Sequence, residues 1–539
     1  MSLRAIVKSG DPWIWLTGGA VATSLLMIGG LLLLVATKSL GFFWPADVVE
    51  LKLEDGTVVL GQVRNHETIP ESSGSGPKGD RVQLQVGNRD LYGADFRWID
   101  ESDVVTSSLR AEAVVLERRE WGNFYGFVKQ IRSGEKVIAS GPQAGWEALS
   151  ERLPAAQRLA AKVRELETSD LAAINYDLES ERLERLRARH SGGPTGAMRA
   201  IEEREAELQQ RYTELRGSIE KLSLESEVDR LIMVDAGGSE KEIGLSQIVH
   251  AYQPNAMSTI SKARLYLAKV WEFVSSDPRE SNTEGGIFPA IFGTVMMVIL
   301  MSIAVVPFGV LAALYLREYA RDGIMVRIVR IAVNNLAGVP SIVFGVFGLG
   351  FFVYFVGGSI DALFFPERLP TPTFGTGGIL WAALTLALLT VPVVVVATEE
   401  ALAAVPKEHR EGSLALGATK FETIWRVVLP SALPGVLTGL ILAMARGAGE
   451  VAPLMITGVV KLAPSLPFDG NWPFLHLDRK FMHLGFHIYD VGFQSPNVEA
   501  AKPMVYATAL LLVLIIVSLN LSAILLRNRL RRRLSGGTF

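Results

Sequence analysis

Arg446 and Glu450 are two ionisable residues inside a long apolar stretch of the chain. Being four residues apart, they fall on one face of a helix, and ionisable side chains in a membrane-spanning helix are costly to expose to lipid. An arginine offers a forked positive site for an oxyanion, and a neighbouring glutamate can hold that arginine and keep the anion from binding too tightly. The pair predicts either part of an anion pathway or an ion pair that only locks helices together.

A second pattern lies in the polar segment 411–430, EGSLALGATKFETIWRVVLP. It combines an acidic residue, two small residues, a glycine and a closing Leu-Pro, at Glu411, Gly412, Ser413, Gly417, Leu429 and Pro430. A short helix with a small face and a polar edge can enter a groove on a soluble partner, and a glycine lets the backbone turn after it. The pattern therefore predicts a docking loop.

Other patterns argue against a nucleotide-binding, metal-binding or hydrolytic site in this chain. The nearest approach to a nucleotide-binding loop, GSGPKGD at Gly74–Asp80, has Asp80 where the lysine belongs, so we interpret it as a flexible turn. His483 and His487 share helical spacing, but no third ligand follows at helix spacing, and we expect no metal site. No Ser/His/Asp or paired-carboxylate arrangement for hydrolysis stands out. We expect a chain that is not an enzyme and binds no cofactor.

The composition indicates a membrane protein. Of the 539 residues 49% are hydrophobic, the mean hydropathy is +0.28 and there is no cysteine. A net charge of -3 and a pI near 6.2 give no excess of positive charge for a nucleic-acid partner. Apolar segments long enough to cross a bilayer occur at 13–37, 286–314, 331–357, 378–397, 432–460 and 503–526. Six spans place both termini on one side of the lipid bilayer.

Lysine and arginine decide which side that is. They gather before the first span, after the second, between the fourth and fifth, and after the last, at Arg4, Lys8, Arg317, Arg321, Arg327, Arg330, Lys407, Arg410, Lys420, Arg426, Arg527, Arg529, Arg531, Arg532 and Arg533. Because positive loops stay inside, this side is cytoplasmic in a multi-pass protein of the inner membrane. Residues 1–45 are then a cytoplasmic tail with the first span, 46–282 a periplasmic insert, 283–530 the membrane core and 531–539 a cytoplasmic tail.

The insert has two kinds of pattern. Residues 47–140 alternate polar and apolar between Gly, Asn and Asp, which predicts a small β domain; 231–249 predict a returning strand pair and 256–275 an amphipathic helix. Residues 144–228 read as charged helices broken at SGGPTG, 191–196, which favours a coiled-coil hairpin, with two solvated helices as the alternative. The 3-4 apolar spacing of the first arm breaks between Leu166 and Leu171.

Segment 411–430 resembles the EAA loop of ABC-importer permeases, with Gly412 and Ser413 where alanines are usual. The resemblance extends over residues 283–530, where four further segments look like phosphate-importer permeases of the PstA type: YLREYA at 315–320, GVPSIVFG at 338–345, ARGAGEVAPL at 445–454 and FMHLGFHIYDVGF at 481–493.

This resemblance implies a polytopic α-helical protein with a type I ABC-importer core and an added α+β insert. It implies a permease subunit that moves inorganic phosphate inward while a partner hydrolyses ATP. The implied partners are a second homologous permease, a cytoplasmic ATPase dimer and a periplasmic phosphate-binding protein. Two alternatives stay open: a permease for another oxyanion or solute, and a membrane sensor of external phosphate. The resemblance gives no role for the insert.

Overall fold

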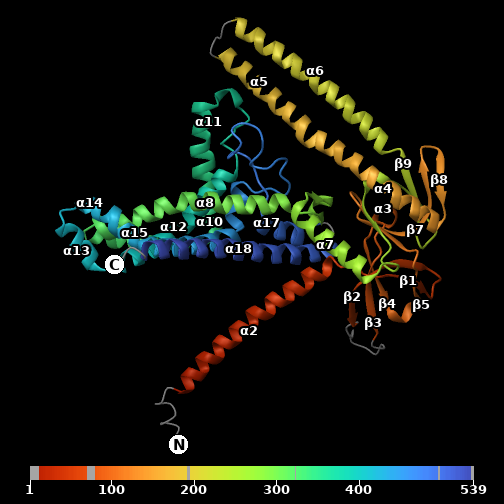
Figure 1. Cartoon of the computed structure of the whole chain (residues 1–539), viewed down its shortest axis with the longest axis horizontal. Helices are drawn as coiled ribbons and strands as arrows, with labels where there is room; N and C mark the ends of the chain where they lie inside the picture. Colours follow the sequence, from red (N-terminus) through yellow and green to blue (C-terminus); the bar gives the residue numbers. More distant parts are fainter. Residues whose placement is uncertain (1–10, 69–78, 191–194, 322, 496–497, 536–539) are drawn as a thin grey trace, which may run out of the picture.

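The computed structural model describes residues 11–68, 79–190, 195–321, 323–495 and 498–535. Figure 1 shows a bundle of long helices, a β-rich insert at one end of it and a helical hairpin that rises from the insert. The first helix, α2 (Asp11–Phe42), leaves the bundle at an angle and contacts α18. Most of the turn interpreted at Gly74–Asp80 and most of the SGGPTG segment lie outside the described residues.

The first sheet of the insert is antiparallel, with the strand order β4-β3-β2-β1-β5. Its strands are β1 (Val48–Leu53), β2 (Val58–Thr68), β3 (Asp80–Gln85), β4 (Phe96–Asp100) and β5 (Val104–Leu109). Alternate apolar residues turn to one face, where Leu51, Leu84 and Ile99 are buried together. The apolar residues of the alternating pattern that predicted strands here thus form the core on one face of the sheet.

The second sheet has the order β10-β9-β7-β6-β11, with β8 also paired to β7. Its strands are β6 (Val114–Arg118), β7 (Asn123–Ser133), β8 (Lys136–Ser140), β9 (Asp229–Val234), β10 (Glu240–Gly244) and β11 (Ile248–Tyr252). The returning segment therefore forms three strands where the sequence predicted a pair. Helix α4 (Pro142–Glu165) covers this sheet by burying Leu149 and Leu153 in the same cluster as Phe124.

Helices α5 (Ala172–His190) and α6 (Thr195–Ser226) form the hairpin and pack along each other (Figure 1). Arg204 on α6 pairs with Glu181 and Glu184 on α5, which ties the two arms together. A π-helical turn at Leu166–Leu171 joins α4 to α5. This wider turn coincides with the break in apolar spacing, because a π turn shifts every following side chain around the helix.

The remaining helices build the membrane core and its connections. They are α3 (Arg89–Tyr92) and α7 (Thr259–Ser275) of the insert, then α8 (Phe288–Leu314), α9 (Ile324–Leu336), α10 (Ser341–Phe347), α11 (Gly358–Phe364), α12 (Ile379–Ala403), α13 (Lys407–Ala415), α14 (Lys420–Thr423), α15 (Leu429–Gly449), α16 (Ala452–Thr457), α17 (Leu484–Tyr489) and α18 (Val498–Ser535). The short strands β12 (Pro278–Arg279) and β13 (Glu284–Gly285) lead from α7 into α8.

Six helical segments of the described chain are long and apolar enough to cross a membrane, which confirms the predicted number. They are Trp13–Phe42, Phe288–Tyr319, Ser341–Phe364, Ile379–Ala403, Lys420–Gly449 and Ala501–Arg532. The predicted third span, 331–357, was placed too early. Pro340 lies just before α10 with extended backbone, and the residues before it form the separate amphipathic helix α9. A proline disfavours a helical residue in front of it, so the apolar run is divided there.

The predicted fifth span, 432–460, was placed too late. The helix begins at Lys420 and ends at Gly449, and Glu450 has an extended backbone before the short helix α16. Helix α15 can lie close to α8 because Gly447 has no side chain. A Cβ at this position would lie 2.4 Å from the sulfur of Met301. Helices α8, α12, α15 and α16 share one buried cluster that includes Met297, Leu386 and Leu454.

Candidate coupling loop and polar sites

The predicted docking loop is a helix, a tight turn and a second helix. After α13, Gly417 has a φ of +86°, in the left-handed region that favours glycine. Thr419 then caps α14 in a reciprocal arrangement, because its side chain accepts from the backbone of Glu422 while the Glu422 carboxylate accepts from the backbone of Thr419. The turn predicted at the glycine is therefore present in the structure, stabilised from both sides.

The outer surface of this loop is apolar. Leu414, Leu416, Phe421 and Trp425 are exposed, Leu416 by 91%, and the rings of Phe421 and Trp425 lie 5.9 Å apart. Several exposed large apolar side chains on a charged loop are typical of a protein-binding surface. These residues were not predicted from the sequence, because the docking pattern depends on the small and acidic positions. The sequence pattern that could have identified them is the presence of large apolar residues within a polar segment.

The predicted loop residues divide into two groups. Glu411 and Gly412 are exposed on α13, while the Ser413 hydroxyl lies 2.9 Å from the Thr423 hydroxyl and holds the two short helices together. Leu429 and Pro430 are half-buried at the start of α15 and do not belong to the exposed surface. The first group borders the apolar patch, and the second anchors the loop to the membrane core.

Arg410 connects the loop to two membrane helices. Its Nη2 donates to the Glu318 carboxylate at 3.0 Å and to the Leu402 carbonyl at 2.7 Å, and its Nη1 donates to the Val405 carbonyl at 3.3 Å. Glu318 lies in the π-helical turn that ends the span of α8, and Leu402 lies in the last turn of α12. From the sequence alone, Arg410 was predicted only to be one of the positive residues of the cytoplasmic side.

Arg446 and Glu450 lie next to each other, as their spacing predicted. Arg446 Nε is 3.6 Å from Glu450 Oε1, and the side chains are 33% and 23% exposed. The geometry differs from a pair within a continuous helix, because Glu450 follows the last helical residue. Broken helices with polar groups at membrane depth are tolerated where they are buried in protein or line a cavity. The structure thus brings the two side chains together where α15 ends.

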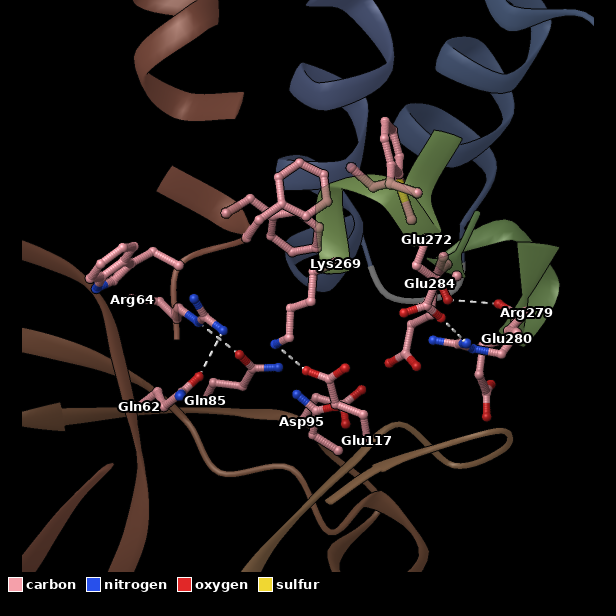
Figure 2. A pocket seen from close by; sticks show the side chains of 18 of the residues that line it. Gln62, Arg64, Gln85, Asp95, Glu117, Lys269, Glu272, Arg279, Glu280 and Glu284 are labelled. Atoms are coloured by element: carbon pink, nitrogen blue, oxygen red, sulfur yellow. Dashed lines mark hydrogen bonds and ion pairs between the residues drawn. The ribbon is translucent and has the colours of Figure 1, made fainter. Parts of the chain in front are cut away.

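A polar cavity of about 300 Å³ separates the insert from the membrane core (Figure 2). Phe43, which follows α2, and Met504 on α18 line it from the membrane side. Ion pairs cross it, since Lys269 on α7 pairs with Glu117 on β6 and Arg89 Nη2 lies 2.8 Å from Glu280. All four residues belong to the insert, so these pairs hold α7 and the turn at Glu280 against its β-rich part.

Two carboxyl groups in this cavity have pKa values far from the usual 4.5 of glutamate. Burial raises the pKa of Glu284 from 4.5 to about 7. The charge of Arg279 acts in the opposite direction, and the nearby carboxylate of Glu117 adds to the increase. The pKa of Glu272 is lowered instead. Burial alone would raise this pKa, but the contact with His250 and the ion pair with Arg279 lower it to about 2. Figure 2 shows both carboxyl groups on the same side of the cavity.

His483 and His487 are buried, His483 at the N-cap of α17 and His487 within that helix. The Nδ1 atom of His483 accepts from the Gly485 backbone at 3.1 Å and caps α17, while Nδ1 of His487 lies 3.3 Å from the Thr508 hydroxyl. In the part of the chain that the structure describes, no group of three or more His, Cys, Asp or Glu is placed to hold a metal ion.

Comparison with known proteins decides the family. Residues 305–536 match the family of binding-protein-dependent transport system inner membrane components. Phosphate transport system permease protein PstA 1 of Mycobacterium tuberculosis is 35% identical over 252 residues, which cover 46% of this chain and 73% of that protein. The chain belongs to this permease family. It is of the PstA type.

Two further relatives extend the match to other organisms. A probable phosphate transport system permease protein PstA of Methanocaldococcus jannaschii is 34% identical over 241 residues, covering 44% of this chain and 74% of that protein. Probable ABC transporter permease protein YqgI of Bacillus subtilis is 30% identical over 258 residues, covering 47% and 81%. Membership in this permease family confirms a type I ABC-importer core. The residues matched to the family start at 305, so the insert lies outside them.

Proposed function

We propose that this chain is a permease subunit of an ATP-driven importer that carries inorganic phosphate across the inner membrane. The observation that carries the proposal is the helix-turn-helix loop around Gly417, with its exposed apolar surface, on a chain with six apolar spans. The substrate assignment is supported by the names of its relatives, several of which are phosphate transport permeases.

The proposed topology places both termini in the cytoplasm and the insert in the periplasm. Figure 1 supports this arrangement, because α13, α14 and the C-terminal end of α18 lie at one end of the bundle and the insert lies at the other. The loop end carries Arg317, Arg410 and Lys420, in agreement with the charge rule for cytoplasmic loops.

The partners follow from what the chain offers and what it lacks. The apolar loop surface is proposed to dock on a cytoplasmic ATPase dimer, which hydrolyses ATP, since this sequence contains no nucleotide-binding pattern of its own. A second related permease would complete the pathway, and a periplasmic phosphate-binding protein would deliver the substrate. No cofactor bound by this chain is needed for these steps.

Within the proposed pathway, Arg446 and Glu450 are the candidate polar groups. The 3.6 Å separation is longer than a hydrogen bond, so the guanidinium keeps donors for a passing oxyanion while Glu450 orients it. Gly447 brings α15 against α8 at this level, so movement of either helix would change the surroundings of the pair.

Uptake measurements test the proposal. A strain lacking this chain, complemented with the wild type, is compared for uptake of labelled phosphate, sulfate and molybdate. We expect complementation to restore phosphate uptake alone. Restored uptake of another oxyanion instead would reassign the substrate, and restored uptake of none would contradict the transport function.

A further inference from the structure

The hairpin of the insert is docked on the outer loops of the membrane core. The Tyr176 hydroxyl donates to the Trp472 carbonyl at 2.6 Å, and the Tyr176 ring lies edge-on to His476. Further along α5, Arg187 Nε lies 2.6 Å from a carboxylate oxygen of Glu367, whose side chain is only 4% exposed. These contacts hold α5 over the loops that follow α11 and precede α17 (Figure 1).

A cavity of about 270 Å³ lies between α5 and these loops. Three cationic side chains line it: Arg182 from α5, and Arg368 and Lys480 from the outer loops. Two carboxylates, Glu179 and Asp478, also line it, so three positive charges face two negative ones and leave an excess of one. The Glu179 carboxylate is already engaged by Nε and Nη2 of Arg182.

Neither Arg368 nor Lys480 forms an ion pair within 4 Å with a carboxylate of the described chain, although the charge of Arg368 helps to lower the pKa values of Glu179 and Glu367. Arg368 Nη1 donates to the Thr373 hydroxyl at 3.1 Å, while Arg368 Nε is buried and makes no hydrogen bond to a described residue. Lys480 makes no ion pair with any residue that the structure describes. Buried guanidinium donors are normally satisfied, so an unpaired one beside a polar cavity indicates a missing acceptor.

Hydroxyl groups complete the lining. Thr371, Thr373 and Thr376 all border the cavity, and each can donate to an oxygen atom. A forked guanidinium, an ammonium and hydroxyl groups match the oxygens of a tetrahedral anion, and a volume near 270 Å³ accommodates such an anion with some of its water.

We propose that this cavity binds inorganic phosphate, held between the hairpin and the outer loops. The inference rests on the proposed function for the identity of the anion, and it adds an external site distinct from Arg446 and Glu450. Arg182 comes from the insert and keeps Nη1 outside its two hydrogen bonds to Glu179, while Arg368 and Lys480 come from the membrane core, so a bound phosphate bridges the two parts. Occupancy then strengthens the docking of the hairpin, which makes that docking depend on external phosphate.

Hydrogen exchange on the purified importer, without its binding protein and in lipid-free detergent, tests this site. Inorganic phosphate is expected to protect residues 172–189 and 366–377, with saturation at increasing concentration. The double variant Arg368→Gln/Lys480→Gln should raise the phosphate concentration needed for half protection about tenfold or more, because it removes both unpaired cations. Arg189→Gln is the matched control, since Arg189 lies exposed on the same helix and does not line the cavity.

The outcomes separate this site from the proposed function. The site is overturned if phosphate does not increase the protection, even if the importer carries phosphate. It is also overturned if phosphate protects the double variant and the control equally well. Phosphate-dependent protection in an importer that moves no phosphate would support the site and contradict the proposed function. An added arm with phosphatidic acid identifies the source of the phosphate group, because protection by that lipid alone would overturn binding of the free anion.

Discussion

Replacing Arg410 with glutamine is expected to uncouple ATP hydrolysis from transport. Arg410 is the side chain through which the docking loop holds the end of α8, at Glu318, and the end of α12, at Leu402. A glutamine is shorter and uncharged, so it cannot make all three contacts together. The ATPase would still find the apolar patch around Leu416, but its movement would reach the two helices less directly.

The structure allows an estimate of the cost. Arg410 and Glu318 are 22% and 13% exposed, so the pair is mostly shielded from solvent. A hydrogen bond to a charged group contributes about 1.5–3 kcal/mol, and removing one partner of a buried pair costs about 3–5 kcal/mol. Allowing for the remaining exposure, we expect a loss of about 3 kcal/mol, or roughly a hundredfold in the equilibrium between attached and detached loop.

The assay is phosphate moved per ATP hydrolysed by the reconstituted importer. Arg410→Gln should lower this ratio while subunit assembly and membrane insertion stay normal. Arg426→Gln is the matched control, because Arg426 lies exposed on the same loop and makes no ion pair with a described residue. An unchanged ratio in Arg410→Gln would refute the coupling role.

A second variant separates coupling from stability. The double change Arg410→Gln with Glu318→Gln leaves no unpaired charge, so most of the stability should return. If the transport ratio returned with it, Arg410 would have only a structural role.

Three other predictions concern the sites already described. Gly417→Asp should abolish transport, because a Cβ there meets no described atom within 4 Å and the added charge would meet only the docked ATPase. Gly417→Asn is the control, since it strains the turn at positive φ in the same way without adding the charge; uptake unchanged in both would contradict docking at this turn. Arg446→Gln should stop phosphate uptake, and the double change with Glu450→Gln decides its meaning: recovered uptake shows a structural pair, whereas an assembled, ATP-hydrolysing complex without uptake supports the pathway. For Glu284, a folded-state pKa near 7 against 4.5 means that the native state binds more protons between those values, so wild-type stability should fall as pH rises from about 4.5 to 7. Glu284→Gln should remove that fall, seen as a higher melting temperature than wild type at pH 8 and little difference at pH 4; equal pH dependence in both proteins would contradict the assignment.

Much of the fold was accessible from local pattern. Alternation predicted the strands of the insert, and the broken apolar spacing at Leu166–Leu171 coincides with a π-helical turn. Span boundaries failed where an apolar run continues through a change of structure, as before Pro340 and after Gly449. Hydropathy averaged over a whole span does not locate such a break, because apolar residues occur on both sides of it.

Contacts between distant segments were not accessible. Strand β9 pairs with β7 across the whole hairpin, and no local signal specifies that pairing. The same limit applies to the sites. The docking loop is contiguous and was predicted, whereas the contact of Arg410 with Glu318 and the cavity between α5 and the outer loops join residues about a hundred or more positions apart.

One helix joins the two ends of the molecule. Glu284 lies four residues before α8, at the cavity between insert and core, and Glu318, the partner of Arg410, lies at the other end of the same span. The helical segment is continuous from Phe288 to Tyr319, so a change at the cavity is expected to reach the docking loop through α8. A double-mutant cycle of Glu284→Gln and Arg410→Gln measures this. The two changes are far apart and share no partner, so their effects on unfolding free energy should add within about 0.5 kcal/mol. Their effects on phosphate moved per ATP should not add, because both act on the position of one helix; additive effects on transport as well would show that the insert and the docking loop act independently.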